Sequence, residues 1–141
     1  MNKKYHFSHS IDLTIPFHDV DSMKVVWHGN YFRYFENARE ALLNTLQFGY
    51  NQMLLSDYCW PVIDAKIKYI RPLTFEQKIK VHAYLTEYEN RLYIDYEIKD
   101  AQTEMVTTKG YTIQVAVHKD TQEICFVTPE IFVNKINGFI K

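Results

Sequence analysis

The sequence has few of the residues that mark specialised protein classes. Its 141 residues include only two cysteines, Cys59 and Cys125, too few for a disulfide framework or a cysteine-based zinc site. Each lies among apolar neighbours, so we expect both to be small buried hydrophobic residues. No linker, repeat or low-complexity segment is evident, and the length suits one domain over residues 1–141.

An excess of charge and long hydrophobic runs are also missing. The 16 basic and 17 acidic side chains nearly balance, and the basic ones are scattered, whereas nucleic-acid-binding proteins carry a basic face. No apolar run approaches the length of a membrane span, and the opening MNKKYHFSHS lacks the apolar centre of a signal peptide. The sequence therefore predicts no nucleic-acid partner, no membrane and a cytoplasmic location.

Aromatic residues are abundant, at 16% of the chain, which favours strands and apolar pockets. Alternating and helical spacings predict strands and one long helix. Strands are expected over residues 10–17, 62–69, 78–85, 92–98, 105–117 and 124–127, with a bulge near Gly110. The long helix is expected over 31–46 with Asn30 as N-cap, and helical turns over 51–56 and 129–136. This order predicts an α+β domain in which five to six antiparallel strands wrap one helix.

Two acids precede the long helix in the stretch HDVDSMKVVWHGNYFRYFENARE. On its own, the pair Asp19 and Asp21 is typical of a turn or a helix cap. The N–H groups at a helix start favour negative charge, however, and thioester hydrolysis places negative charge on the carbonyl oxygen. A carboxylate beside them can attack the carbonyl or activate water. These parts suffice for acyl transfer, so no cofactor and no metal are expected.

Residues 17–40 resemble the hotdog acyl-CoA thioesterases of the 4-hydroxybenzoyl-CoA thioesterase/YbgC-like type. The motif of that family runs D-x-D-x-x-G-V-V-[YW]-[HY]-x-N-Y, followed by an aromatic-rich helix with E-x-x-R. The residues in register are Asp19, Asp21, Val25, Val26, Trp27, His28, Asn30, Tyr31, Glu36 and Arg39. The resemblance implies the hotdog fold and hydrolysis of an acyl thioester. The segment VDSMKVVWHGNY is similar to a bacterial subgroup of this family in which the acyl group is attached to a carrier protein. The expected substrate is therefore an acyl thioester of CoA or of an acyl carrier protein.

The resemblance also implies a role for each matching residue. Asp21 occupies the position of the family's catalytic carboxylate, which acts as nucleophile or general base. The His28 N–H occupies the position of the group that polarises the thioester carbonyl. The His28 side chain either orients substrate or caps the helix. Glu36 and Arg39 form either a surface ion pair or a partly buried orienting pair, and Glu36 is a second candidate for the catalytic acid. The other expected substrate-binding residues are Asp19, Lys24, Val26, Trp27, Asn30, Tyr31, Tyr58, Val62 and Ile63, with Asp19 also shaping the loop.

The sequence departs from the family motif in two places. Lys24 stands where the family usually has glycine, and Glu76-Gln77 replaces a frequent Gly-Asp. A non-glycine residue at positive φ is strained. We therefore expect the loop to have relaxed to ordinary backbone angles, with Lys24 placing a positive charge near the site entrance.

The sequence leaves two alternative functions open, and it favours a homo-oligomer. The alternatives are a non-catalytic acyl-thioester-binding module and, with less support, a hydratase or dehydratase on the same fold; Ser22 lacks the G-x-S-x-G elbow of a serine hydrolase. A single sheet around one helix leaves edge strands open to pairing. The resemblance implies a homodimer, or a dimer of dimers (homotetramer), in which Asp21 faces the partner's 58–63 segment.

Overall fold

The computed structural model describes residues 4–140, and it contains a five-stranded antiparallel sheet with the strand order β1-β4-β5-β6-β3. The strands of this sheet are β1 (Phe7–Thr14), β3 (Val62–Tyr69), β4 (Lys78–Glu87), β5 (Leu92–Asp100) and β6 (Val106–Gln114). A separate pair is formed by β2 (Tyr58–Cys59) and β7 (Val117–His118). The helices are α1 (Tyr31–Thr45), α2 (Tyr50–Leu55) and α3 (Glu130–Ile140), with 3-10 turns η1 (Phe17–Asp19) and η2 (His28–Asn30). The predicted α+β arrangement of one long helix and an antiparallel sheet is confirmed.

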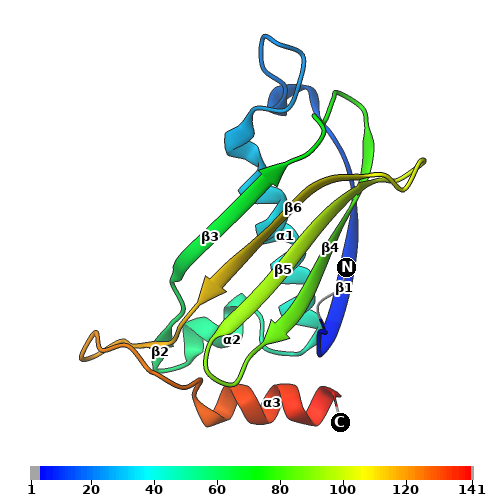
Figure 1. Cartoon of the computed structure of the whole chain (residues 1–141). Coiled ribbons are helices and arrows are strands. Elements are labelled where there is room, and N and C mark those ends of the chain that lie inside the picture. Colours follow the sequence, from blue (N-terminus) through cyan, green and yellow to red (C-terminus); the bar gives the residue numbers. More distant parts are fainter. Residues whose placement is uncertain (1–3, 141) are drawn as a thin grey trace.

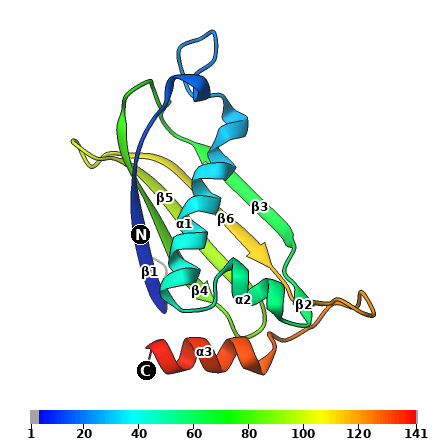
Figure 2. The same ribbon diagram turned by 180° about the vertical axis from the view of Figure 1, so that it is seen from behind.

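Helix α1 lies along one face of the sheet, and α3 lies across one end of it (Figures 1 and 2). The alternation in β4 explains this packing, because Ile79, Val81, Ala83 and Leu85 all point to the same face and are fully buried. From α1, Phe35 stacks on Tyr96 of β5 with ring centroids 4.4 Å apart. The core therefore lies between α1 and the sheet.

Gly110 of β6 allows a close approach between sheet and helix. A Cβ atom at this position would lie 2.4 Å from the Lys66 backbone oxygen and 2.6 Å from the Phe35 ring. The bulge predicted at Gly110 is wrong, because the pairing of β6 with β3 and β5 runs through this residue without a shift. The irregularities lie between Val62 and Asp64 and between Ile98 and Lys99. The positions of β6 two residues before and after Gly110 are the buried polar residues Thr108 and Thr112, so the apolar pattern changes there without a bulge.

Most other predicted elements are present with shifted ends. The strand over 62–69 is confirmed with its bounds, and the first strand lies earlier than predicted, at Phe7–Thr14. The predicted strand over 124–127 is wrong, since only a single bridge joins Val117 to Ile124. The C-terminal helical turn is a longer helix, α3, and the 51–56 turn is α2. No helix within residues 4–140 combines the length and apolar character needed to cross a membrane.

Candidate active site

The loop that carries Asp21 is a tight hairpin. Val20 and Val26 form an isolated bridge, the Asp21 N–H donates to the Val25 oxygen at 2.9 Å, and the Lys24 N–H donates to the Asp21 oxygen at 3.0 Å. This pattern is a turn followed by a residue at positive φ, which closes a three-residue hairpin loop. The side chain of Asp21 is partly exposed, and its Oδ1 accepts from the Met23 N–H at 2.8 Å. Its Oδ2 has no partner among the described residues and is the oxygen available for chemistry.

Lys24 occupies the left-handed position of this hairpin, with φ 65°. The expectation that the loop has relaxed to ordinary angles is therefore wrong. The physical reason is that the two hydrogen bonds that close the hairpin require this backbone shape whatever the residue. Glu76, the other position at which the family often has glycine, also has positive φ, at 67°. At both positions the backbone keeps the left-handed angles that glycine adopts easily, and the side chain of Lys24 or Glu76 adds strain there.

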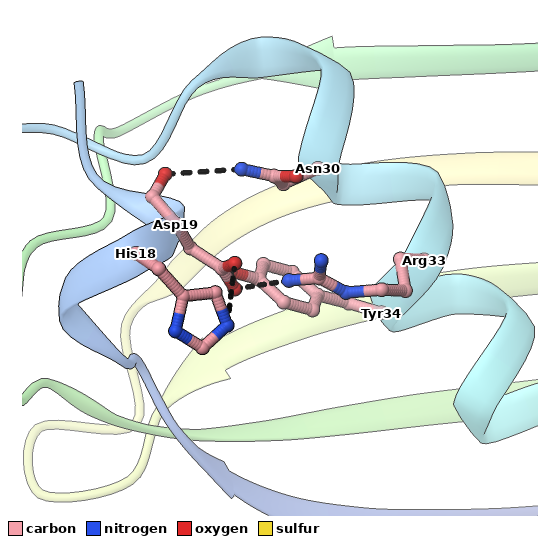
Figure 3. A network of polar contacts seen from close by, with 5 residues as sticks. All are labelled: His18, Asp19, Asn30, Arg33 and Tyr34. Carbon is pink, nitrogen blue, oxygen red and sulfur yellow. Dashed lines mark hydrogen bonds and ion pairs between the residues drawn. The ribbon is translucent and has the colours of Figure 1, made fainter.

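The buried carboxylate of Asp19 lies at the centre of a polar network that joins η1 to the start of α1 (Figure 3). Its side chain is 1% exposed. The Oδ2 atom accepts from the Tyr34 hydroxyl at 2.6 Å and from the Arg33 guanidinium, and His18 Nε2 lies 3.6 Å from Oδ1. The backbone oxygen of Asp19 accepts from the Trp27 N–H and from the Asn30 side-chain amide, both at 3.0 Å. This single residue therefore ties η1, the hairpin and the start of α1 together.

The electrostatics of the network keep Asp19 ionised. Burial by itself raises the pKa of this carboxyl, but the hydrogen bonds from Tyr34 and Arg33 outweigh burial and hold the pKa below its ordinary value. Burial, followed by the neighbouring Asp19, raises the pKa of Tyr34. Arg33 and Tyr34 were not predicted as site residues. Their signal in the sequence is a basic and a hydroxylated side chain side by side in the first turn of the helix that follows the acids.

The 3-10 turn η2, just before α1, begins with a backbone donor that no residue within 4–140 pairs. The His28 N–H has no acceptor among the described residues, while its carbonyl accepts from the Tyr69 hydroxyl at 3.1 Å. The His28 side chain is exposed and makes no cap hydrogen bond, nor does Asn30, whose amide turns instead to Asp19. Asn30 does occupy the N-cap position of α1, as predicted, but its side chain makes no capping hydrogen bond. A hydrogen-bond donor at the helix start remains available to an oxyanion.

The remaining predicted residues near the hairpin divide into buried and exposed ones. Val26 and Tyr31 are buried, and the Tyr31 ring packs against Tyr69 with centroids 4.8 Å apart. Trp27 is half-exposed, and its ring covers Gly29, where a Cβ atom would lie 2.2 Å from it. A residue larger than glycine at position 29 would displace the indole. Trp27 is thus the predicted residue of this loop that offers the largest apolar surface to a ligand.

A cavity of about 580 Å³ lies at the other end of β3, between the second half of α1, α2 and β2. Its lining residues come from α1 (Glu36, Arg39, Glu40, Leu43), α2 and its flank (Tyr50, Met53, Leu54), β2 and the residue after it (Tyr58, Cys59, Trp60), and Gln114 and Lys119. Tyr58 is the predicted substrate residue found here, and Val62 and Ile63 follow it, exposed on the edge strand β3. Asp21 is not among the lining residues.

The cavity also corrects two expectations. Cys59 is exposed in its wall, and Cys125 is only partly buried, so neither cysteine is the fully buried residue predicted. Glu36 and Arg39 both line the cavity, and no ion pair joins them within the described part of the chain. Residues 4–140 contain no group of three His, Cys, Asp or Glu side chains placed to hold a metal ion.

Comparison with known proteins identifies the family. Residues 15–132 match the Thioesterase-like superfamily, which is most of the chain. The chain belongs to this superfamily. The predicted hotdog thioesterase family and the prediction of a thioester hydrolase are confirmed at this level. A Bacillus subtilis (strain 168) protein described as "Putative acyl-CoA thioesterase YneP" is 27% identical over 111 residues, which cover 78% of this chain and 80% of that protein.

Solved structures of named thioesterases have a similar fold. A DHNA-CoA thioesterase from Staphylococcus aureus superposes with a TM-score of 0.77 at 27% identity, over 83% of this chain and 78% of that one. Slr0204, a 1,4-dihydroxy-2-naphthoyl-CoA thioesterase from Synechocystis, superposes with a TM-score of 0.81 at 17% identity, over 93% and 96% of the two chains. At the latter identity the likeness is one of fold alone.

Proposed function

We propose that the protein hydrolyses the thioester of an acyl-CoA, with Asp21 as the catalytic carboxylate. The observation that carries this proposal is that, among residues 4–140, neither the Asp21 Oδ2 in the hairpin nor the His28 N–H at the start of η2 has a hydrogen-bond partner. The relatives named as acyl-CoA and DHNA-CoA thioesterases support the substrate class. An acyl carrier protein is the second source of the thioester.

Two routes fit this arrangement. In the first, an Asp21 oxygen attacks the carbonyl carbon, the C–S bond breaks, the thiolate leaves and takes up a proton, and water then hydrolyses the mixed anhydride. In the second, Asp21 takes a proton from a water molecule as that water attacks the carbonyl, and the C–S bond breaks in the same way. In both, the His28 N–H stabilises the negative charge that develops on the carbonyl oxygen.

A complete site requires a second copy of the chain. The chain that follows the Asp21 hairpin lies at the Tyr69 end of β3, since the Tyr69 hydroxyl donates to the His28 oxygen. β2 lies at the other end of β3 (Figure 1), and its residues Tyr58 and Cys59 line the cavity. β3 is an edge strand, and Val62 and Ile63 on it are exposed. Antiparallel pairing of β3 with its copy reverses the direction of one chain and brings each hairpin beside the partner's cavity. We therefore propose a homodimer, and a dimer of dimers as its further assembly.

The test of the reaction is a panel of acyl-CoAs with detection of the released thiol. Wild-type protein is expected to release thiol, and Asp21→Asn is expected to lose nearly all activity with its melting temperature unchanged. Asp19→Asn is expected to lose less activity, because Asp19 acts through the shape of the hairpin. An Asp21→Asn rate within a few-fold of wild type contradicts the assignment. Hydration of an enoyl thioester, or saturable binding without turnover, favours the two alternative functions.

The test of the shared site is complementation between two inactive chains. Asp21→Asn removes the carboxylate, and Cys59→Trp fills the cavity. In an equal mixture about half of the dimers are mixed, and each of these has one intact site of two, so about a quarter of wild-type activity is expected to return. No recovery after subunit exchange, or a fully active monomer by light scattering, contradicts the proposal.

A further inference from the structure

The direction of the His28 N–H is set by the peptide unit to which it belongs. This unit joins Trp27 to His28, and its carbonyl oxygen accepts from the Asn30 N–H at 2.9 Å. A trans peptide is planar, and its N–H points opposite to its C=O. The hydrogen bond at the Trp27 oxygen therefore also fixes where the His28 N–H points.

The backbone oxygen of Asp19 holds this peptide unit from both sides. It accepts from the Trp27 N–H and from the Asn30 side-chain amide, both at 3.0 Å. His28 lies between these two residues in the chain. A displacement of Asp19 therefore moves the N–H donor that the proposed reaction uses, although Asp19 itself lies outside the reacting groups.

The side chain of Asp19 is held in turn by the first turn of α1 (Figure 3). The Tyr34 hydroxyl donates to Oδ2 at 2.6 Å, and the Arg33 guanidinium donates to the same atom. The third group that faces the carboxylate is the exposed His18 of η1, whose Nε2 lies 3.6 Å from Oδ1. The Asp19 side chain is 1% exposed, so the loss of Tyr34 or Arg33 leaves a buried oxygen short of a partner rather than in water.

We propose that Arg33 and Tyr34 are positioning residues for the hydrolysis, and that they act through Asp19 to aim the His28 N–H at the thioester carbonyl oxygen. This inference rests on the proposed function. It implies that the donor is held correctly only while Asp19 is charged, because the bonds from Arg33 and Tyr34 are strong when their acceptor is a carboxylate. When Asp19 takes up a proton, its hold on the donor loosens and the oxyanion loses stabilisation.

The same network sets the pH at which this loss occurs. Burial raises the pKa of Asp19, and the hydrogen bonds from Tyr34 and Arg33 outweigh burial in the wild-type protein. Removing either bond raises the pKa of Asp19, so the carboxylate takes up its proton at a higher pH. A variant at either position is therefore expected to lose activity in acid earlier than the wild type.

The pH profile of thiol release from an acyl-CoA tests this inference in Tyr34→Phe and Arg33→Met. At neutral pH, kcat is expected to fall about tenfold, less than the loss of about 10²–10³-fold that follows removal of an oxyanion donor, with KM within about twofold of wild type. The pH at which kcat falls to half its plateau in acid is expected to rise by about one unit. Tyr88→Phe is the matched control, because this buried tyrosine donates to Asn137 of α3. It is expected to lose stability but to keep the wild-type kcat and acid midpoint.

A double variant separates positioning from a general loss of structure. In Tyr34→Phe combined with Asp19→Asn, position 19 has no proton to take up, so the acid midpoint is expected to return to the wild-type value while kcat stays low. Circular dichroism at each pH gives the folded fraction, to which the rates are referred. An unchanged midpoint in both Tyr34→Phe and Arg33→Met, or a shift that persists in the double variant, overturns the inference even where thiol release supports the proposed function.

Nuclear magnetic resonance reads the same geometry without turnover. The amide resonances of Trp27 and of the Asn30 side chain report on the two bonds to the Asp19 oxygen. Their acid transition is expected to shift upward by about one pH unit in Tyr34→Phe and to disappear in Asp19→Asn. Where no acyl-CoA releases thiol, the proposed function fails, and these resonances decide the control of the donor by Asp19. The same transition in wild type and Tyr34→Phe then overturns it.

Discussion

The buried carboxylate of Asp19 leads to a quantitative prediction for Asp19→Asn. The charged Oδ2 accepts two hydrogen bonds, from Tyr34 and Arg33. A hydrogen bond to a charged group contributes about 1.5–3 kcal/mol. The Arg33 side chain is 46% exposed, so water replaces part of its interaction and only the Tyr34 bond counts in full. We therefore expect the free energy of unfolding to fall by about 2–3 kcal/mol, or roughly 6–10 °C in melting temperature.

The assay is urea denaturation of wild type and variant across pH. The native pKa of Asp19 is depressed, so its contribution is present above the unfolded-state pKa of about 3.9 and is lost as pH falls through the native pKa. The gap between wild type and Asp19→Asn is expected to stay constant from about pH 5 to 8 and to close below about pH 4. Loss of the stability difference in acid is the direction expected for a carboxylate whose charged form is stabilised in the folded state.

The matched control is Asp12→Asn. The Asp12 side chain is 81% exposed and lies 3.8 Å from Lys80, and a surface ion pair of this kind contributes about 0–1 kcal/mol. If Asp19→Asn loses no more stability than this control, or if its gap from wild type persists unchanged in acid, the account of the network is wrong.

Two backbone positions give further predictions. Lys24→Gly relieves the positive φ and is expected to raise the free energy of unfolding by about 1 kcal/mol, whereas Lys68→Gly, in a strand, is expected to lower it; an unchanged melting curve for the first contradicts the strain. Gly110→Ala places a Cβ 2.4 Å from a backbone oxygen and is expected to cost about 1–3 kcal/mol or more. Gly138→Ala, with no atom within 4 Å of the new Cβ, is expected to stabilise α3 by about 0.5–1 kcal/mol. If denaturant unfolding shows equal changes in stability for Gly110→Ala and Gly138→Ala, the packing argument is contradicted.

The sequence predicts the elements whose side chains carry a strong period. The alternation of Ile79, Val81, Ala83 and Leu85 is visible without coordinates, and it is the inner face of β4. The apolar spacing of α1 is equally legible, although Phe32 is partly exposed because the sheet covers only one side of the helix. Short pairings such as the bridge between Val117 and Ile124 carry no such period. The sequence predicts a full strand over residues 124–127, where the structure has one bridge.

The candidate site divides in the same way. The order of Asp19, Asp21 and His28 before a helix indicates acyl chemistry, because the charged groups, the backbone donors and the helix start all lie within one short stretch of sequence. That Asp19 is buried beneath Arg33 and Tyr34 is decided by packing between residues 14 and 15 apart.

Three features exist only in the tertiary structure. The left-handed backbone at Lys24 follows from hydrogen bonds that close the hairpin, which outweigh the preference of the residue itself. The cavity joins α1, α2, β2 and Gln114 of β6, which no local pattern brings together. Its position at the end of β3 away from Asp21 follows from the strand order, since sheet pairing, rather than any sequence motif, sets which segments become neighbours.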